Sequence, residues 1–247
     1  TGSTTPTHLL CNSVCEGEIN LTPIGGTSPY TFKWYNTPTA PTSEDVVELC
    51  AGTYHVEVTD KNLCVDTIST VVNEPDTLVA TIISLTNVLC HGDQTGSAAV
   101  SQTGGIGGYS YSWYDAPHDP ALPVINSLPA GTYHVRVADL NDCADTVEFT
   151  ITQPTVPLSS SISDTVHILC KNDCIGEAEA LPSGGVADYN YSWYDVLGTP
   201  TTSRVTGLCD GTYHVKVTDQ NGCLDTSEVI IREPLQELVV SINDSVN

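Results

Sequence analysis

Ten cysteines are the residues in this sequence whose side chains could do the most chemistry. In an exported protein such a set forms disulfides, whereas closely spaced pairs can instead bind zinc. The closest pairs have the form Cys-x-x-x-Cys, at Cys11 with Cys15 and at Cys170 with Cys174. The distribution of the cysteines along the chain discriminates between the two chemistries.

The cysteines belong to an internal repeat of about eighty residues. The sequence Gly-Thr-Tyr-His-Val begins at Gly52, Gly131 and Gly211. The same offsets relate Trp34, Trp113 and Trp193; Cys11, Cys90 and Cys170; Gly25-Gly26, Gly104-Gly105 and Gly184-Gly185; and Pro75, Pro154 and Pro234. We therefore expect three domains, at 1–75, 76–154 and 155–234, followed by a segment 235–247.

The three repeats act as controls on one another for cysteine pairing. The first and third hold four cysteines each, but the second holds two and has Gln94 and Pro129 at the other two positions. Cysteines that vanish together are expected to be bonded to each other, because losing one partner leaves a reactive thiol. Zinc is disfavoured because the second repeat would keep half of the ligands. The predicted bridges are Cys11–Cys64, Cys15–Cys50, Cys90–Cys143, Cys170–Cys223 and Cys174–Cys209.

An acidic motif, Asp-x-Asn-x-x-x-Asp, also recurs in every repeat. Its members are Asp60, Asn62 and Asp66; Asp139, Asn141 and Asp145; and Asp219, Asn221 and Asp225. Oxygen ligands at alternate positions can hold calcium. However, the motif lies between two expected strands, and Asn141-Asp142 and Asn221-Gly222 are pairs that favour hairpin turns. We favour a turn without a cofactor and keep calcium as the alternative.

Three histidines occupy the same position in their repeats, at His55, His134 and His214. They alternate with apolar residues along an expected strand, which places them on the face opposite the core. Because they lie one repeat apart, they cannot meet at one metal ion. No set of Ser, His and acidic residues recurs, and we expect no enzymatic activity in this chain.

The net charge of −23, from 7 basic and 30 acidic residues, excludes the partners that basic patches recognise. Nucleic acid and anionic membrane surfaces would be repelled. No apolar run approaches the roughly 18 residues of a membrane helix, so membrane insertion is not expected. The low charged fraction of 15% suits an extracellular surface.

Alternating apolar and polar residues indicate that strands position these side chains. In the second repeat Tyr109, Tyr111 and Trp113 share one face. We expect about seven short strands per repeat, six of them near 78–85, 96–102, 109–115, 122–128, 131–139 and 143–152, and no helix. A tryptophan in the third strand is typical of immunoglobulin-like sandwiches. The predicted fold class is all-β, with three tandem immunoglobulin-like β-sandwich modules.

Each repeat closes with Glu-Pro or Gln-Pro, and the next strand begins three or four residues later. Proline restricts the joint, and there is no flexible linker. We therefore expect the modules to form a semi-rigid rod.

The two ends of the sequence differ. Leu238 to Asn247 reads like the opening strand of a further repeat, whereas Thr1 to Thr7 is polar. One explanation is a piece of a longer array, which fits a chain without methionine. The other is strand donation, in which Val239, Val240 and Ile242 of one subunit complete the first module of the next and polymerise the protein.

The order of motifs resembles the SprB repeat. Leu-Cys is followed by Gly-Gly, an aromatic strand ending in Trp, Gly-Thr-Tyr-x-Val-x-Val-x-Asp, Asn-x-Cys and Gln/Glu-Pro. The resemblance implies repeats of long cell-surface or secreted proteins that leave the cell by type IX secretion, as in gliding-motility adhesins. It implies a structural and adhesive filament segment with neighbouring repeats or subunits, and possibly surface polysaccharide, as partners. The alternatives are an array that binds glycan or host protein, and a spacer of a secreted enzyme.

The resemblance also gives meaning to Asp-Thr or Asp-Ser before an apolar residue, the O-glycosylation motif of the same bacteria. Candidate sites are Thr67, Thr77, Thr146, Thr165 and Ser245. Thr67 and Thr146 occupy equivalent positions in their repeats.

Overall fold

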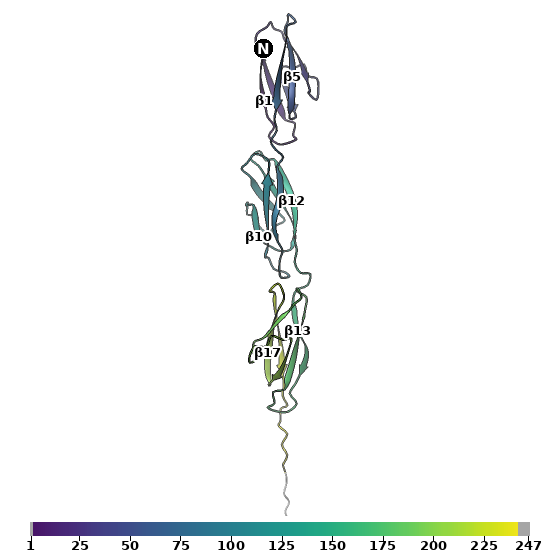
Figure 1. Cartoon of the computed structure of the whole chain (residues 1–247), viewed down its shortest axis with the longest axis vertical. Coiled ribbons are helices and arrows are strands. Elements are labelled where there is room, and N and C mark those ends of the chain that lie inside the picture. The colour runs from purple at the N-terminus through teal and green to yellow at the C-terminus, as the bar shows by residue number, and fades with distance from the viewer. Residues whose placement is uncertain (1, 242–247) are drawn as a thin grey trace, which may run out of the picture. The chain divides into compact units, whose positions relative to one another are not determined.

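The computed structural model describes residues 2–241, which form eighteen strands joined by turns and loops (Figure 1). These residues contain no helix, and thus none long and apolar enough to cross a membrane. The expectation of an all-β fold is confirmed.

The strands fall into three sets of six. The first set comprises β1 (Gly2–Thr7), β2 (Gly17–Pro23), β3 (Thr31–Tyr35), β4 (Val46–Leu49), β5 (Gly52–Thr59) and β6 (Val65–Val72). The second comprises β7 (Val79–Thr86), β8 (Gly96–Thr103), β9 (Ser110–Tyr114), β10 (Val124–Leu128), β11 (Gly131–Ala138) and β12 (Ala144–Ile151). The third comprises β13 (Ser159–Val166), β14 (Gly176–Ser183), β15 (Asn190–Trp193), β16 (Arg204–Leu208), β17 (Gly211–Thr218) and β18 (Leu224–Ile231). We call the three sets modules 1, 2 and 3.

Each module contains two three-stranded sheets. In module 1 the strand orders are β1-β2-β4 and β3-β5-β6, and the other modules repeat them. With strands lettered in the immunoglobulin manner, these are the orders A-B-E and C-F-G, without strand D. The modules are therefore immunoglobulin-like sandwiches with a shortened first sheet.

The missing strand explains why we find six strands where about seven were expected. In module 2 strand D would have to form between β9 and β10, but residues 115–123 contain Pro117, Pro120 and Pro123. Proline has no amide hydrogen to donate to a neighbouring strand. The chain therefore crosses directly from one sheet to the other. The six observed strands of module 2 lie where the alternation pattern predicted them.

Side chains from both sheets make the core of each module. Along β14 buried and partly exposed residues alternate, because successive side chains point to opposite faces. Trp193 is fully buried, and its indole N–H donates to the carbonyl of Thr202 at 3.0 Å. The core of module 3 comprises Ile168, Ala178, Ala180, Trp193, Val205, Leu208, Val215, Val217, Val229 and Ile231. Trp34 and Trp113 are buried in the same way, as expected.

A tyrosine near the start of the fifth strand fastens the connection between the sheets. The Tyr54 hydroxyl donates to the carbonyl of Cys50 at 2.8 Å, and Tyr213 donates to Cys209 at 3.2 Å. Both bonds reach back four residues, as in the tyrosine corner of immunoglobulin-like domains. The bonds anchor the turn that carries Cys50 and Cys209.

The polar N-terminal segment forms a full strand, contrary to the strand-donation interpretation. β1 pairs with β2 from Gly2 opposite Pro23 to Thr7 opposite Glu18. Backbone hydrogen bonds alone hold this edge strand, since none of its side chains is fully buried. The place that a donated strand would fill in module 1 is therefore occupied. In the tail, Val239 and Val240 are exposed and outside any strand, and Ile242 lies outside the described residues.

The contacts divide the chain into two compact units that do not coincide with the modules. Unit 1 comprises Thr1–Leu85, Ala98–Ile125 and Thr132–Phe149, and unit 2 comprises Thr86–Ser97, Asn126–Gly131 and Thr150–Asn247. Module 2 is thus shared between the units. As a result, the segments that join module 1 to module 2 lie in unit 1, and those that join module 2 to module 3 lie in unit 2.

We predict that Gly176→Ala destabilises module 3 by about 1–3 kcal/mol, as over-packing of a core does. A Cβ atom at Gly176 would lie 2.7 Å from Cγ2 of Ile231 and 2.9 Å from the carbonyl oxygen of Leu208. Urea unfolding followed by tryptophan fluorescence measures the change. The matched control is Ser183→Ala, at the exposed end of the same strand, which should leave the midpoint unchanged. Equal midpoints for both variants would contradict the prediction.

Candidate functional site

The structure contains four disulfides, and two of them join different modules. Cys15–Cys50 and Cys174–Cys209 lie within modules 1 and 3, as expected. Cys11–Cys143 joins module 1 to module 2, and Cys90–Cys223 joins module 2 to module 3. Their Cα–Cα distances are 5.5 and 5.6 Å, within the usual range for disulfides. Cys64 and Cys170 are free and exposed.

The predicted bridges Cys11–Cys64, Cys90–Cys143 and Cys170–Cys223 are wrong, because each would join opposite ends of one module. In module 1, Cys11 follows the end of β1, whereas Cys64 borders the same cavity as Gly2, at the start of β1. The six residues of β1 span about 20 Å at the usual rise of a strand. A disulfide requires Cα atoms within about 7 Å. Only the facing end of the next module brings a second cysteine close enough.

The within-module bridges extend a strand pair. In module 1, Gly17 at the start of β2 pairs with Leu49 at the end of β4. Cys15 and Cys50 stand just beyond this pair, so the bridge closes the end of the sheet. Module 2 lacks this bridge and has Gln94 and Pro129 instead.

A buried aspartate shapes the turn that carries the second cysteine of the joint. Asp139 is 6% exposed. One of its carboxylate oxygens accepts the amide hydrogens of Asn141 at 2.9 Å and Cys143 at 3.0 Å, and the other accepts that of Ile106 at 2.9 Å. Asp142 has a positive φ of 62°, which the hairpin-turn prediction anticipated. The carboxylate thus ties the turn to the loop after Gly104-Gly105 and fixes the direction of Cys143.

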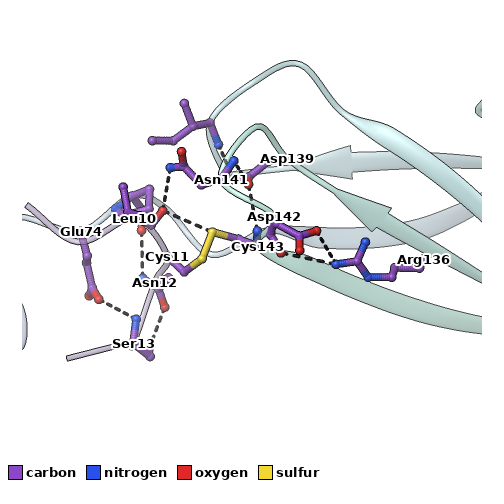
Figure 2. Close-up of a disulfide and its surroundings, with 12 residues drawn as sticks. Leu10, Cys11, Asn12, Ser13, Glu74, Arg136, Asp139, Asn141, Asp142 and Cys143 are labelled. Atoms are coloured by element: carbon purple, nitrogen blue, oxygen red, sulfur yellow. Dashed lines mark hydrogen bonds and ion pairs between the residues drawn. A yellow bond between two sulfur atoms is a disulfide. The ribbon is translucent and has the colours of Figure 1, made fainter. Parts of the chain in front are cut away.

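This turn docks on the Leu-Cys loop of the preceding module (Figure 2). The Asn141 side-chain amide donates to the carbonyl oxygen of Leu10 at 3.0 Å. The Sγ atom of Cys143 lies 3.2 Å from the same oxygen, although a bridged sulfur has no proton to donate. The joint between modules 1 and 2 therefore combines one covalent bond with one hydrogen bond.

The joint between modules 2 and 3 has the same design. Asp219 accepts the amide hydrogens of Asn221 and Cys223, each at 2.9 Å. The Asn221 side-chain amide donates to the carbonyl oxygen of Leu89 at 2.9 Å. Two joints built from equivalent residues indicate a repeated feature of the sequence.

The residue before the closing proline folds back on the Leu-Cys loop. The amide of Ser13 donates to the Glu74 carboxylate at 2.7 Å, and that of Gly92 donates to the Gln153 side chain at 2.8 Å. The Asn12 side chain donates to the carbonyl of Pro75 at 3.0 Å. These bonds give a physical reason for the recurrent Glu-Pro and Gln-Pro. They hold the connecting segment against the module that it leaves.

The three aspartates that begin the acidic motif serve backbone amides. The amide hydrogens of Cys64, Thr27 and Asn62 lower the pKa of Asp60 below its ordinary value. For Asp139, burial raises the pKa, but the hydrogen bonds from Ile106, Asn141 and Cys143 outweigh it and the pKa falls. The described residues hold no group of three or more His, Cys, Asp or Glu side chains that could bind a metal ion.

The last aspartate of each motif is separated in role from the first. Asp145 accepts the amide hydrogen of Ala80 at 2.8 Å, and Asp225 accepts that of Ser160 at 2.6 Å. Both therefore hold the opening strand of their module. The motif that suggested calcium is in the structure a pair of backbone clamps.

The recurrent histidines lie on β5, β11 and β17, on the face away from the core. His134 contacts Asp115 at 3.0 Å and Glu148 at 3.1 Å. His214 contacts Asp195 at 2.6 Å and Glu228 at 3.2 Å, whereas His55 contacts Ser69. Each histidine stays within its own module.

Three of the O-glycosylation candidates are exposed, namely Thr67 on β6, Thr146 on β12 and Thr77 before β7. Thr165 is half-buried on β13, and Ser245 lies outside the described residues. The Thr77 hydroxyl donates to the Asn12 side chain at 2.8 Å. Modification of these residues stays a prediction.

Comparison with known families places these joints in context. The model of the SprB repeat matches residues 3–39 and 82–117, in modules 1 and 2. The chain carries SprB repeats. Module 3 shows the same motifs outside the matched segments. No curated protein matches the chain.

Solved structures of tandem extracellular-type domains are similar to the chain at low identity. Three N-terminal domains of the bacteriophage RB49 outer capsid protein Hoc are 15% identical, with a TM-score of 0.42, over 97% of this chain and 99% of that one. Eight immunoglobulin domains of Down syndrome cell adhesion molecule are 13% identical, with a TM-score of 0.35, over 94% and 34%. Protocadherin gamma B2 cadherin domains 3–6 are 11% identical, with a TM-score of 0.35, over 94% and 72%. At these scores the likeness adds nothing to the sheet topology.

We predict that non-reducing peptide mapping recovers Cys11 linked to Cys143 and Cys90 linked to Cys223. Each cysteine faces its partner from the next module at disulfide distance. Because Cys64 and Cys170 are exposed, two thiols per chain should react with a thiol reagent in the folded protein. A peptide linking Cys11 to Cys64, or a folded chain without reactive thiols, would contradict the structure.

We predict that His134 and His214 titrate above the ordinary histidine pKa of about 6.5. The hydrogen bond to Asp115 raises the pKa of His134, and Glu148 adds to it against partial burial. Asp195 and then Glu228 raise the pKa of His214 in the same way. Because the folded state raises both values, this contribution to stability is present below about pH 6.5 and is lost as the pH rises through the folded pKa.

NMR titration of the imidazole resonances checks this. Asp115→Asn should lower the pKa of His134 and leave that of His214 in place. An unchanged His134 titration in that variant would show that Asp115 is not the cause.

Proposed function

We propose that the chain is a non-catalytic, tension-bearing segment of a long extracellular protein at the cell surface. The observation that carries the proposal is the covalent joint between successive modules, formed twice from equivalent residues. A protein whose modules only needed to stay connected would be served by the peptide linker alone. The second covalent connection gives each joint a path for load that bypasses the linker.

The arrangement of the two bridges limits how far the chain can be extended. Cys90 lies inside the loop closed by Cys11–Cys143, and Cys143 lies inside the loop closed by Cys90–Cys223. The shortest covalent path between the two ends therefore passes through both bridges and through residues 90–143. It uses roughly 90 residues, or about 300 Å at full extension. Unfolding under tension then releases only part of the chain.

The family, the composition and the exposed acidic surface support the placement outside the cell. SprB repeats match modules 1 and 2, and the net charge of −23 opposes binding to nucleic acid or to anionic membrane. Disulfides persist in oxidising compartments. We propose neighbouring repeats as the principal partners of these modules. The proposed adhesive role, type IX secretion and O-linked sugar on Thr67 and Thr146 rest on the family.

Single-molecule force spectroscopy tests the proposal. The oxidised chain, pulled from its two ends until all modules unfold, should reach a contour length of about 300 Å. The variant with serine at Cys11, Cys143, Cys90 and Cys223 should reach about 600 Å, because only the two within-module bridges remain.

The matched control removes a bridge that lies off the shortest path. Cys15→Ser with Cys50→Ser should leave the contour length at its original value, since neither residue lies on the loaded segments. A native contour length equal to that of the fourfold serine variant would show that the joints carry no load, and would overturn the proposal.

A further inference from the structure

The two free cysteines are the unpaired halves of the joint seen elsewhere in the chain. Cys64 holds the turn position of Cys143 and Cys223, and Cys170 holds the Leu-Cys position of Cys11 and Cys90. Both thiols are exposed. Module 1 therefore presents one half of a joint, and module 3 presents the complementary half.

The turn around Cys64 already has the geometry of a joint. The Asp60 carboxylate accepts the amide hydrogens of Asn62 at 2.8 Å and Cys64 at 2.9 Å, and that of Thr27 at 3.0 Å. This is the arrangement that Asp139 and Asp219 form in the closed joints. The Asn62 amide group, whose equivalents bind a leucine carbonyl, donates to the Thr27 hydroxyl at 3.0 Å.

The loop around Cys170 is equally formed. The amide of Asn172 donates to the Glu233 carboxylate at 2.7 Å, as Ser13 does to Glu74. Lys171 adds a salt bridge to Glu233 at 2.9 Å. The hydrogen bond from Asn172, and then Lys171, lower the pKa of Glu233.

A second feature of module 1 is independent of sulfur. A cavity of about 260 Å³ lies beside Cys64, bordered by Gly25, Gly26, Tyr30 and Asp60. In modules 2 and 3 a leucine covers the corresponding glycine. A Cβ atom at Gly105 would lie 3.3 Å from Leu78, and one at Gly185 would lie 3.2 Å from Leu158.

The segment ahead of the first strand produces this difference. In modules 2 and 3 the backbone of residues 76–78 and 156–158 runs along the glycine pair, where Gly105 donates to the carbonyl of Asp76 at 2.9 Å and Gly185 to that of Val156 at 3.0 Å. At Gly25 an added Cβ atom would meet nothing within 4 Å among the described residues. Module 1 therefore has the receiving surface without the segment that covers it.

The tail of this chain carries the matching segment. Leu238 stands eighty residues after Leu158, as Leu158 stands eighty after Leu78. It is 91% exposed, whereas Leu78 is 7% exposed. By the same offset, residues 236–240 correspond to 76–80, and they end before the position of β1. The tail can therefore cover the glycine pair of module 1 without displacing β1.

We propose that module 3 of one copy of the chain docks on module 1 of a second copy, with Cys170 bonded to Cys64 and Leu238 in the cavity beside Gly26. The contact is head to tail and leaves the opposite ends free, so it can be repeated. It would continue the tension-bearing array of the proposed function across copies. The inference rests on the internal equivalence of the joints.

Formation of the bond requires a disulfide oxidant, such as oxidised glutathione. The Cys170 thiolate attacks one sulfur of the oxidant and releases one thiol, and the Cys64 thiolate then displaces the second. Two protein thiols and one small disulfide thus yield one protein disulfide and two small thiols. Two electrons and two protons pass to the oxidant.

Two variants of the full chain test the pairing. Cys170→Ser keeps only the Cys64 thiol, and Cys64→Ser keeps only the Cys170 thiol. In a glutathione redox buffer each variant alone should stay monomeric, whereas their mixture should give one disulfide-linked dimer. Peptide mapping of the dimer should recover Cys64 linked to Cys170, and the unaltered chain should give a ladder of oligomers. Symmetric dimers of either variant as abundant as the mixed one, or no linked product at all, would overturn the proposal.

A substitution in the tail tests the docking surface separately from the thiols. Leu238→Asp in the Cys64→Ser variant should slow formation of the mixed dimer at least tenfold. Leu235→Asp is the matched control, because Leu235 is 95% exposed and precedes the segment that matches 76–80. Equal rates for the two variants would remove Leu238 from the contact. Failure in either experiment would leave the force measurement on a single chain unaffected.

Discussion

The carboxylate of one buried aspartate in each module organises most of what distinguishes this chain. In module 2, Asp139 accepts three backbone amide hydrogens, two from its own turn and one from Ile106. Bonds to an ionised acceptor are stronger than those between neutral groups. They hold the turn in a shape that a left-handed residue completes and that aims Asn141 and Cys143 at the preceding module. Without the carboxylate, three amides near the core would lose their partner and the joint would lose its direction.

The direction of the joint follows from strand geometry. The Leu-Cys loop comes after the first strand of a module, and the Asp-x-Asn-x-Cys turn joins the fifth and sixth strands at the other end. Each module therefore has two unlike ends, and a pair of modules can be bridged in only one order. The linker reinforces this order, because Glu74 and Gln153 bind the loop that they follow.

Much of the fold could be predicted from the sequence, because it depends on local patterns. Alternation placed the strands of module 2, the tryptophans marked the core, and the pair Asn141-Asp142 marked the turn. The absence of strand D was not foreseen, although three prolines between β9 and β10 were a visible signal. The strand formed by polar Gly2–Thr7 was also missed, because its pairing depends on backbone groups that every residue has.

The disulfide joints were missed for a different reason. Comparison of the repeats identified Cys15 with Cys50, since both are absent from module 2, and left the others to be paired by elimination. Elimination assumed partners within one repeat. A repeat that contains both halves of a joint gives the same cysteine count when each half bonds to a neighbour, and differs only in leaving Cys64 and Cys170 over. The signal that distinguishes the two is spatial, because a sandwich keeps its two ends about one strand length apart.

The interleaving of the two bridges has a consequence for survival outside the cell. Every peptide bond between residues 11 and 223 lies inside at least one of the loops that Cys11–Cys143 and Cys90–Cys223 close. A protease that cuts any single bond in this range leaves both fragments covalently attached. Between residues 90 and 143 both loops overlap, so a bond there is spanned twice. Extracellular proteases would therefore have to cut the chain more than once to sever it.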